Sequence, residues 1–167
     1  MTTKLIIHTD GGARGNPGPA GIGVVIEQDG KIIHEFGKTI GETTNNVAEY
    51  TAVIEALQYI ISEGVTWAEG LPRRGPLVGV LGRKPTAGPR GEEYIRKEIH
   101  FLLDSKLVVE QLNGNYKIKD AKLRELSLKI RMLEQELSGG VITYAHVPRE
   151  KNKEADRLVN QALDDNS

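Results

Sequence analysis

The sequence predicts an α/β fold, with a five-stranded mixed sheet in the order 3-2-1-4-5 and helices on both faces. Three strand patterns precede the first helical pattern, and the later strands are separated by helices. Strands joined by a tight turn run antiparallel, whereas strands joined through a helix run parallel by a right-handed crossover. Strands one, four and five should therefore be parallel, with strands two and three extending from the other edge of strand one.

The chain opens with three strands joined as a meander. These strands are expected at residues 3–9, 20–28 and 31–40. Asp29 and Gly30 form a two-residue hairpin turn between the second and third strands. The loop at residues 11–19 is rich in glycine, which permits positive φ, and in proline, which fixes the exit direction. We expect this loop to be rigid and to let ligands approach the backbone.

Apolar residues recur at three- and four-residue steps in four later segments, which are expected to be helices at 46–62, 105–113, 122–137 and 152–163. Asn45 or Asn46 would cap the first helix, and Gly64 would end it. Strands four and five are expected at 98–103 and 141–147.

Length and composition indicate one domain, residues 1–167, with one core. The chain has no cysteine, so any metal must be held by oxygen or imidazole ligands. Its net charge of −1 gives no overall attraction to nucleic acid, which local patches would have to supply. No apolar run is long enough for a membrane span, and the N-terminus lacks a signal-peptide pattern. We expect a cytoplasmic monomer without a membrane partner.

Four carboxylates, Asp10, Glu49, Asp104 and Asp156, lie at strand ends or on the apolar-periodic stretches of helices. Asp10 is expected to end strand one and Asp104 to end strand four. In an open sheet, ligands bind beyond the carboxyl ends of the strands at the switch point, here between strands one and four. The topology therefore predicts that Asp10 and Asp104 meet.

Each carboxylate also has a structural explanation. Glu49, in the first turn of its helix, could form a capping box with Asn46, and Asp104 could cap the helix that begins at Ser105. Asp156 could complement a helix dipole, and Asp10 could be a turn residue before Gly11. Four independent coincidences are less probable than one shared site, so we favour a divalent-metal centre.

Four motifs occur along the chain in this order: Thr9-Asp10-Gly11-Gly12 with Gly15-Asn16-Pro17-Gly18, Thr44-Asn45-Asn46-Val47-Ala48-Glu49, Asp104-Ser105-Lys106-Leu107-Val108, and Asn152-Lys153-Glu154-Ala155-Asp156. Together they resemble type 1 ribonuclease H over residues 3–64 and 98–164. The resemblance implies a ribonuclease H-like fold and an endonuclease that cuts the RNA strand of RNA/DNA hybrids. Asp10, Glu49, Asp104 and Asp156 stand in the places of the family's metal-binding carboxylates.

The implied chemistry suits hard cations, because Mg²⁺ prefers carboxylate and water oxygens, and Mn²⁺ should substitute. Two ions about 3.5–4 Å apart would activate a water and stabilise the leaving 3′ oxygen, with Asp10 bridging them by resemblance. The products would carry 5′-phosphate and 3′-hydroxyl ends. Without metal, repulsion among the carboxylates should raise at least one pKa.

Substrate contacts implied by the motifs are Gly11, Asn16, Thr44, Asn45 and Asn46, whose groups can bond sugars, base edges and phosphates without adding charge. Asn45-Asn46 as a helix cap and Asn16 as a turn residue are the structural alternatives. Lys106 stands where many relatives carry an uncharged amide, so phosphate attraction and a solvated helix face are both open.

Many relatives place a loop histidine before the last helix, whereas this chain has Val147-Pro148-Arg149, as in shorter bacterial and archaeal members of the family. We favour Arg149 as the assisting group, because an arginine near the scissile phosphate stabilises developing charge, although it cannot act as a base. His146 is the competitor, but the alternation of strand five makes it a strand side chain, as are His8, His34 and His100.

The main departure from the family is a basic, glycine- and proline-rich insertion at about 66–97. Its basic residues outnumber its acidic ones: Arg73, Arg74, Arg83, Lys84, Arg90, Arg96 and Lys97 against Glu69, Glu92 and Glu93. It is either a basic arm that adds phosphate contacts or a tolerated surface insertion. The basic protrusion that some relatives carry after the strand-four helix is absent, so we expect modest substrate affinity.

Two other functions fit these motifs less well. A non-catalytic module that binds hybrid or double-stranded RNA should lack at least one carboxylate, and all four are present. Another nuclease or transposase of the wider superfamily should lack the Asn-Pro-Gly loop together with the Thr-Asn-Asn motif, and both occur. Cleavage of double-stranded RNA as a side activity is left open.

Overall fold

The computed structural model describes residues 2–63, 96–137 and 140–167. Five strands run over β1 Thr2–Ala13, β2 Gly18–Gln28, β3 Lys31–Thr43, β4 Arg96–Leu103 and β5 Gly140–His146. The helices are α1 Asn45–Ser62, α2 Lys106–Leu112, α3 Ala121–Glu136, the short 3₁₀ turn η1 Arg149–Lys151, and α4 Lys153–Asp165. Each expected helix and strand has its counterpart.

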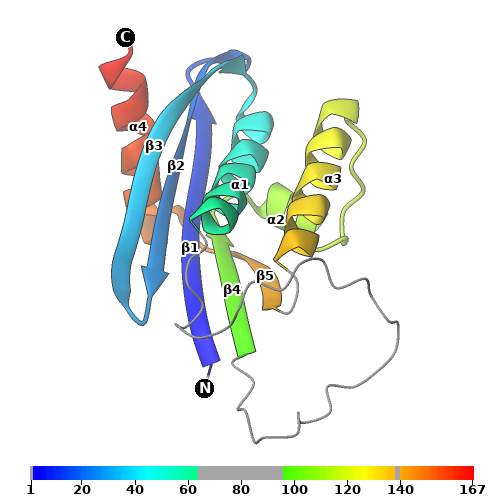
Figure 1. Ribbon diagram of the computed structural model, residues 1–167. Coiled ribbons are helices and arrows are strands. Elements are labelled where there is room, and N and C mark those ends of the chain that lie inside the picture. Colours follow the sequence, from blue (N-terminus) through cyan, green and yellow to red (C-terminus); the bar gives the residue numbers. More distant parts are fainter. Residues whose placement is uncertain (1, 64–95, 138–139) are drawn as a thin grey trace, which may run out of the picture.

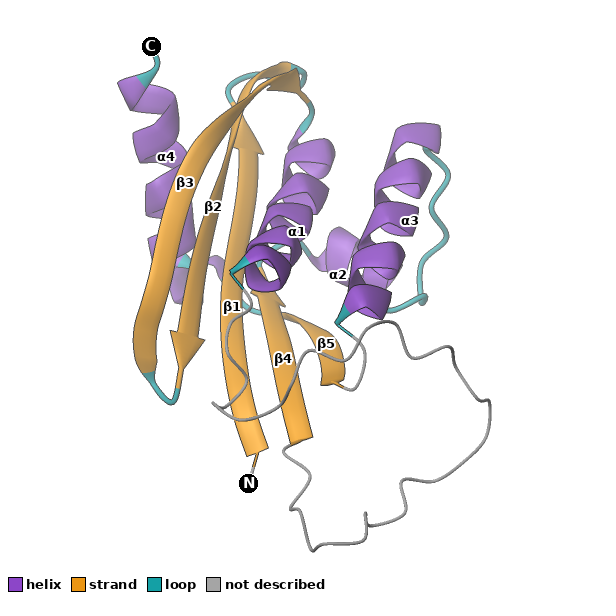
Figure 2. Cartoon of the chain, viewed as in Figure 1, coloured by secondary structure: helices purple, strands orange, loops and turns teal. Residues whose placement is uncertain are grey.

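The sheet order is β3-β2-β1-β4-β5, as predicted. β1 pairs antiparallel with β2 and parallel with β4, β2 pairs antiparallel with β3, and β4 pairs parallel with β5. Figure 2 shows this mixed sheet with all five strands in one layer. The Asp29-Gly30 hairpin is also confirmed, with both residues at positive φ.

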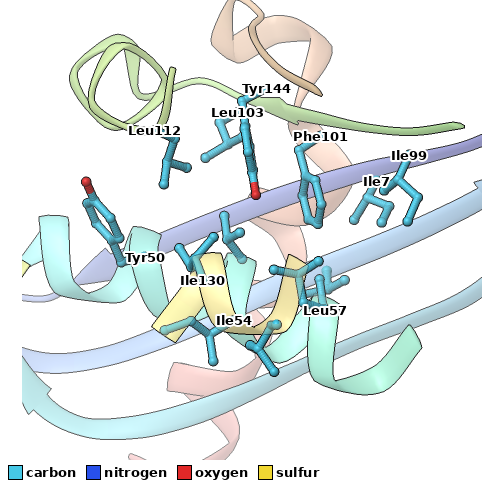
Figure 3. Close-up of a cluster of buried hydrophobic side chains, with 14 of the residues drawn as sticks. Ile7, Tyr50, Ile54, Leu57, Ile99, Phe101, Leu103, Leu112, Ile130 and Tyr144 are labelled. Atoms are coloured by element: carbon cyan, nitrogen blue, oxygen red, sulfur yellow. The ribbon is translucent and has the colours of Figure 1, made fainter. Parts of the chain in front are cut away.

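Helices cover both faces of the sheet, again as predicted. α1, α2 and α3 lie on one face, and α4 lies alone on the other, over β2 and β3 (Figure 1). The main core fills the first face, where residues of β1 and β4 meet the apolar sides of α1 and α3. Figure 3 shows part of this cluster, in which Ile7, Ile99 and Phe101 of the sheet face Leu57 and Ile130 of the helices.

The strands are longer than their sequence patterns suggested. β1 continues through the glycines to Ala13, and β2 already begins at Gly18, because antiparallel pairing between them runs on to Ala13 opposite Ala20. The predicted loop at 11–19 is therefore reduced to residues 14–17. The prediction that β1 ends at Asp10 is wrong for the same reason.

The helix caps differ from the expected ones. Thr44, not Asn45 or Asn46, caps α1, and its Oγ1 accepts from the backbone N–H of Val47 at 3.3 Å. Glu49 lies beyond the first turn of α1, so the structural alternative of a capping box with Asn46 does not hold. Ser105, not Asp104, caps α2, with its Oγ accepting from Val108 at 3.4 Å. Glu49 and Asp104 thus have no capping role.

Most of the predicted insertion at 66–97 lies outside the described residues. Its last two residues, Arg96 and Lys97, belong to β4, where they pair with Thr2 and Thr3. Of the helices in the described ranges, none is long and apolar enough to cross a membrane.

Candidate functional site

Asp10 lies where β1 changes its pairing partners. β1 pairs with β4 only as far as His8, opposite Leu102, whereas its pairing with β2 continues past Asp10. Asp10 is therefore just beyond the carboxyl end of β4, at the predicted switch point. Asp10 is only 7% exposed.

Glu49 reaches the same place because α1 packs against β1 without an intervening side chain. A Cβ built on Gly11 would lie 2.4 Å from the backbone nitrogen of Glu49, which no other residue than glycine tolerates. Glu49 is 6% exposed, and its Oε2 is buried without a hydrogen-bond partner among the described residues. A buried carboxylate oxygen of this kind is costly unless a cation binds it.

Asp104 follows the last residue of β4, and Asp156 lies in the first turn of α4. Oxygens of Asp10, Glu49 and Asp104 all lie within 4.8 Å of one another. Asp156 is outside this group of three, but it lines the same cleft and is half-buried. The structure thus brings three of the four predicted carboxylates together and places the fourth beside them.

A buried hydrogen bond fixes the two helices that carry this group. Tyr50, the residue after Glu49, donates from its hydroxyl to Oε1 of Gln111 in α2 at 3.0 Å. Asp104 and Ser105, the N-cap residue of α2, lead directly into that helix. The bond therefore limits relative movement between the elements that hold Glu49 and Asp104.

Burial and mutual repulsion raise the pKa values of Asp10, Glu49 and Asp104. Burial, followed by the charges of Asp104 and Asp156, raises the pKa of Asp10 to about 7. Burial and the charges of Asp10 and Asp104 raise the pKa of Glu49 well above its usual range. Burial also raises the pKa of Asp104, although the Arg149 guanidinium opposes this. The expectation of electrostatic strain without metal is confirmed in its direction.

Arg149 lines the same cleft and pairs with Asp156. Its Nη2 lies 3.3 Å from Oδ1 of Asp156, while its own side chain is 76% exposed. It can therefore turn towards a phosphate at the mouth of the cleft. His146, in β5, places Nε2 3.1 Å from the backbone oxygen of Asp104, so this competitor also lies beside the site.

An open cleft of about 470 Å³ contains the group, with Gly11, Asn45 and Arg149 among its lining residues. Asn45 is held by two hydrogen bonds: its Oδ1 accepts from Ala13 N–H at 2.8 Å, and its own N–H donates to Oδ1 of Asn16 at 3.1 Å. Both side-chain oxygens are thus used within the protein. In the described ranges no hydrogen bond uses the Nδ2 of Asn45 or Asn16, which leaves both amides to donate.

The other predicted substrate residues lie outside the lining of this cleft. Thr44 caps α1, and Lys106 is exposed at the start of α2. Asn46 instead lines a second open groove, of about 560 Å³, together with Tyr116, Lys117 and Lys119 from the segment between α2 and α3. Asn46 therefore lies at the second groove, whereas its neighbour Asn45 lies at the first.

Two neighbours of the site were not predicted. Asn160 donates from Nδ2 to the backbone oxygen of Asp156 at 3.0 Å and to its Oδ2 at 3.4 Å. Arg14 lines the cleft and pairs with Asp164 at 2.6 Å. The four-residue helical spacing of Asn160 from Asp156 is a signal that could have found it.

The residues present fit a divalent cation of the hard type. The donor set is made only of carboxylate oxygens, one of them buried without a partner, and together they carry more negative charge than Arg149 offsets. Mg²⁺ and Mn²⁺ prefer such oxygen ligands.

Comparison with known proteins gives one consistent family. A model described as RNase H matches residues 2–67, and one described as reverse transcriptase-like matches residues 93–162. Ribonuclease HI of Halobacterium salinarum is 38% identical over 163 residues, which cover 97% of this chain and 65% of that protein. A crystal structure of RNase H1 from this archaeon is 34% identical, with a TM-score of 0.74 and coverage of 97% of this chain and 98% of that one.

Two further relatives extend the comparison. The crystal structure of LC11-RNase H1 in complex with an RNA/DNA hybrid is 40% identical, with a TM-score of 0.75, and covers 96% of this chain and 97% of that one. A bifunctional protein of Mycobacterium tuberculosis is 36% identical over 163 residues, which make up 96% of this chain but only 36% of that protein. This chain therefore spans about a third of the mycobacterial relative.

Proposed function

The chain belongs to the ribonuclease H family, and on that premise we propose that it is an endonuclease that hydrolyses the RNA strand of RNA/DNA hybrids. The observation that carries the proposal is the group formed by Asp10, Glu49 and Asp104, with Asp156 beside it, in the lining of an open cleft. Its relative LC11-RNase H1 binds an RNA/DNA hybrid in its crystal structure.

We assign Asp10, Glu49, Asp104 and Asp156 as the ligands of two Mg²⁺ ions, for which Mn²⁺ would substitute. When bound, such ions supply an activated water and stabilise the oxygen that leaves the scissile phosphate. The bond from phosphorus to the 3′ oxygen breaks while a bond to the water oxygen forms. The products then carry a 5′-phosphate and a 3′-hydroxyl.

The protein's own side chains orient the RNA strand and distinguish it from a DNA strand. We infer that the side-chain amides of Asn45 and Asn16 act as donors to the RNA strand, because their oxygens are already bonded to backbone N–H groups. Donors suit the 2′-hydroxyl oxygen and the acceptors on base edges, which are the features that distinguish an RNA strand. Gly11 supports this arrangement mainly by letting α1 approach β1.

A duplex needs room for its second strand, and the groove at Asn46 offers it. Tyr116 provides an exposed ring, and Lys117 and Lys119 provide positive charge next to it. Aromatic rings and lysines bind nucleic-acid strands by stacking and by phosphate attraction. We place the DNA strand there and the RNA strand in the carboxylate cleft, with Asn45 and Asn46 between them.

Arg149 is proposed to stabilise negative charge on the phosphate. Its pairing with Asp156 holds the guanidinium at the mouth of the cleft, and its exposure lets it exchange that partner for a phosphate oxygen. Because guanidinium does not lose its proton, Arg149 does not act as a base.

Several expectations stay predictions: one domain over residues 1–167, an insertion at 66–97 that either binds phosphate or is tolerated, a monomeric state, a cytoplasmic location, a contact from Lys106, and side activity on double-stranded RNA.

The proposal is tested with end-labelled RNA/DNA hybrid, double-stranded RNA and double-stranded DNA of one sequence, each incubated in Mg²⁺, Mn²⁺ or EDTA. Cleavage confined to the RNA strand of the hybrid, present with either metal and absent in EDTA, supports the proposal. Binding of the hybrid without cleavage in either metal contradicts it and favours a non-catalytic binding module.

A further inference from the structure

Asn152 stands at the N-cap position of α4 but does not cap the helix. Its side chain makes no bond to the first turn of α4, whereas Thr44, Ser105 and Asp120 cap their helices with a side-chain oxygen. Instead, Nδ2 of Asn152 donates to the backbone oxygen of Thr9 in β1 at 2.9 Å, across 143 positions of the sequence. The residue is only 1% exposed.

This arrangement is unfavourable as a purely structural device. Oδ1 of Asn152 is buried without a hydrogen-bond partner among the described residues, and so is Oγ1 of the adjoining Thr9. An unsatisfied buried oxygen destabilises the folded state, and an asparagine that capped its own helix would stabilise it. Helix stability therefore does not explain where the side chain points.

The position of the hydrogen bond between Asn152 and Thr9 explains the direction of the Asn152 side chain better. Thr9 immediately precedes Asp10, and Asn152 is bonded through its backbone to the two other cleft residues on this segment. Its N–H donates to the oxygen of Arg149 at 3.0 Å, and its oxygen accepts from the N–H of Asp156 at 3.1 Å. One side-chain bond thus connects the backbone beside Asp10 with the backbone of both Arg149 and Asp156.

A second contact fixes the distance between the same two elements. A Cβ on Gly23, which pairs with Asp10 in the sheet, would lie 2.1 Å from the backbone oxygen of Ala155. α4 therefore rests directly on the sheet at this glycine, while Asn152 sets where the helix begins along β1. Together they define the position of Asp156 relative to Asp10.

We propose that Asn152 is a positioning residue, which holds Asp156 and Arg149 in register with the Asp10, Glu49 and Asp104 group. The expected loss of catalysis rests on the proposed function, whereas the expected loss of metal binding does not. Loss of the amide should leave the fold intact while Asp156 moves away from the other carboxylates.

Asn152→Ser tests this most sharply. Serine is a preferred helix cap but is too short to reach the oxygen of Thr9, so α4 keeps or gains stability while the connection to β1 is lost. Asn113→Ala is the matched control, because Nδ2 of Asn113 makes an equivalent bond, to the backbone oxygen of Tyr144 at 3.1 Å, away from the cleft. Asn152→Ala removes the amide without adding a cap.

Each variant is titrated with Mn²⁺ by calorimetry, melted, and assayed for kcat and KM on the hybrid. For Asn152→Ser we expect about 10-fold weaker Mn²⁺ binding and a kcat about 10-fold lower or more, the scale typical of residues that support metal ligands. Its KM and melting temperature should match those of Asn113→Ala. Equal Mn²⁺ binding in the two variants, or a loss of kcat that follows only the melting temperature, would overturn the inference.

If the wild-type protein binds Mn²⁺ but does not cleave the hybrid, the proposed function fails, and the titration alone decides the role of Asn152. Weaker Mn²⁺ binding in Asn152→Ser than in Asn113→Ala then supports the positioning role, and equal binding overturns it. Should Asn152→Ser not fold, the same comparison is made with Asn152→Ala.

Discussion

Gly11 and Glu49 touch through their backbones: a Cβ on Gly11 would lie 2.4 Å from the nitrogen of Glu49 and 2.3 Å from the carbonyl carbon of Ala48. This contact brings α1 close enough to β1 for Glu49 to join Asp10. The geometry of the carboxylate group thus depends on the absence of a side chain at position 11.

Gly11→Ala should therefore displace α1 and reduce both stability and activity. Backbone atoms cannot move aside as a flexible side chain would, so we expect a loss of about 2–4 kcal/mol in the free energy of unfolding. Gly12→Ala is the control, because its Cβ would meet only Val159 Cγ1, at an ordinary 3.7 Å. Urea unfolding of both variants checks this, and equal stability of the two would contradict the packing role of Gly11.

The raised pKa of Asp10 predicts how stability depends on pH without metal. Because the pKa rises from 3.8 to about 7 on folding, the folded state keeps a proton that the unfolded state releases between these pH values. The contribution of protonated Asp10 to the free energy of unfolding is complete below this pH window, falls as the pH rises through the window, and is lost above it.

Asp10→Asn removes the contribution of Asp10 to this dependence, while the raised pKa values of Glu49 and Asp104 leave theirs. Relative to wild type in EDTA, the variant should gain free energy of unfolding from pH 4 to pH 8, by at most roughly 4 kcal/mol at 1.36 kcal/mol per pKa unit. Urea unfolding at a series of pH values measures the difference, with the exposed Asp165→Asn as control. A constant difference between wild type and Asp10→Asn would show that Asp10 does not titrate in this window.

Arg149→Ala should lower kcat without a matching change in hybrid affinity. Loss of one group that stabilises transition-state charge reduces kcat by about 10- to 100-fold or more, and Arg149→Lys should restore part of it. Arg157→Ala is the matched control, since Arg157 pairs with Glu154 and Glu35 on α4 and β3, outside the cleft lining. If His146→Ala lowers kcat and Arg149→Ala does not, His146 is the assisting group.

Tyr116→Ala tests the second groove. With the DNA strand stacked against this ring, the KM for the hybrid should rise on the order of 5-fold with kcat nearly unchanged. Met132→Ala on the outer side of α3, where Met132 is 66% exposed, is the control. An unchanged KM for Tyr116→Ala would contradict the placement of the DNA strand in this groove.

Sequence periodicity and connection rules predicted the sheet order, because each crossover joins elements with a strong apolar repeat. They also placed Asp10 and Asp104 together, because Asp104 follows the last residue of β4 and Asp10 lies just beyond the part of β1 that pairs with β4. The assignment of Glu49 and Asp156 to the same site relied on family motifs. Their places depend on close backbone contacts at Gly11 and Gly23, which no local pattern reveals.

Errors in the sequence predictions concentrate where neighbouring polar residues compete for one role. Thr44 and Asn45 both suit an N-cap, as do Asp104 and Ser105, and only the tertiary structure decides which side chain turns back to the helix. Asn152 is the opposite case, because a side chain suited to capping bonds instead to a distant strand. Strand ends were also misjudged, since glycine-rich residues 11–13 pair with β2 despite their turn-like composition.

The central claim is that Asp10 and its neighbouring carboxylates hold the metal that cleaves RNA. Its most direct test is single-turnover cleavage of an end-labelled RNA/DNA hybrid by wild type and Asp10→Asn, over a range of Mg²⁺ concentrations. We expect Mg²⁺-dependent cleavage of the RNA strand by wild type and at least about a 1000-fold lower rate for Asp10→Asn at every concentration, with hybrid binding retained. Cleavage by Asp10→Asn at the wild-type rate, or wild-type cleavage that persists in EDTA, would contradict it.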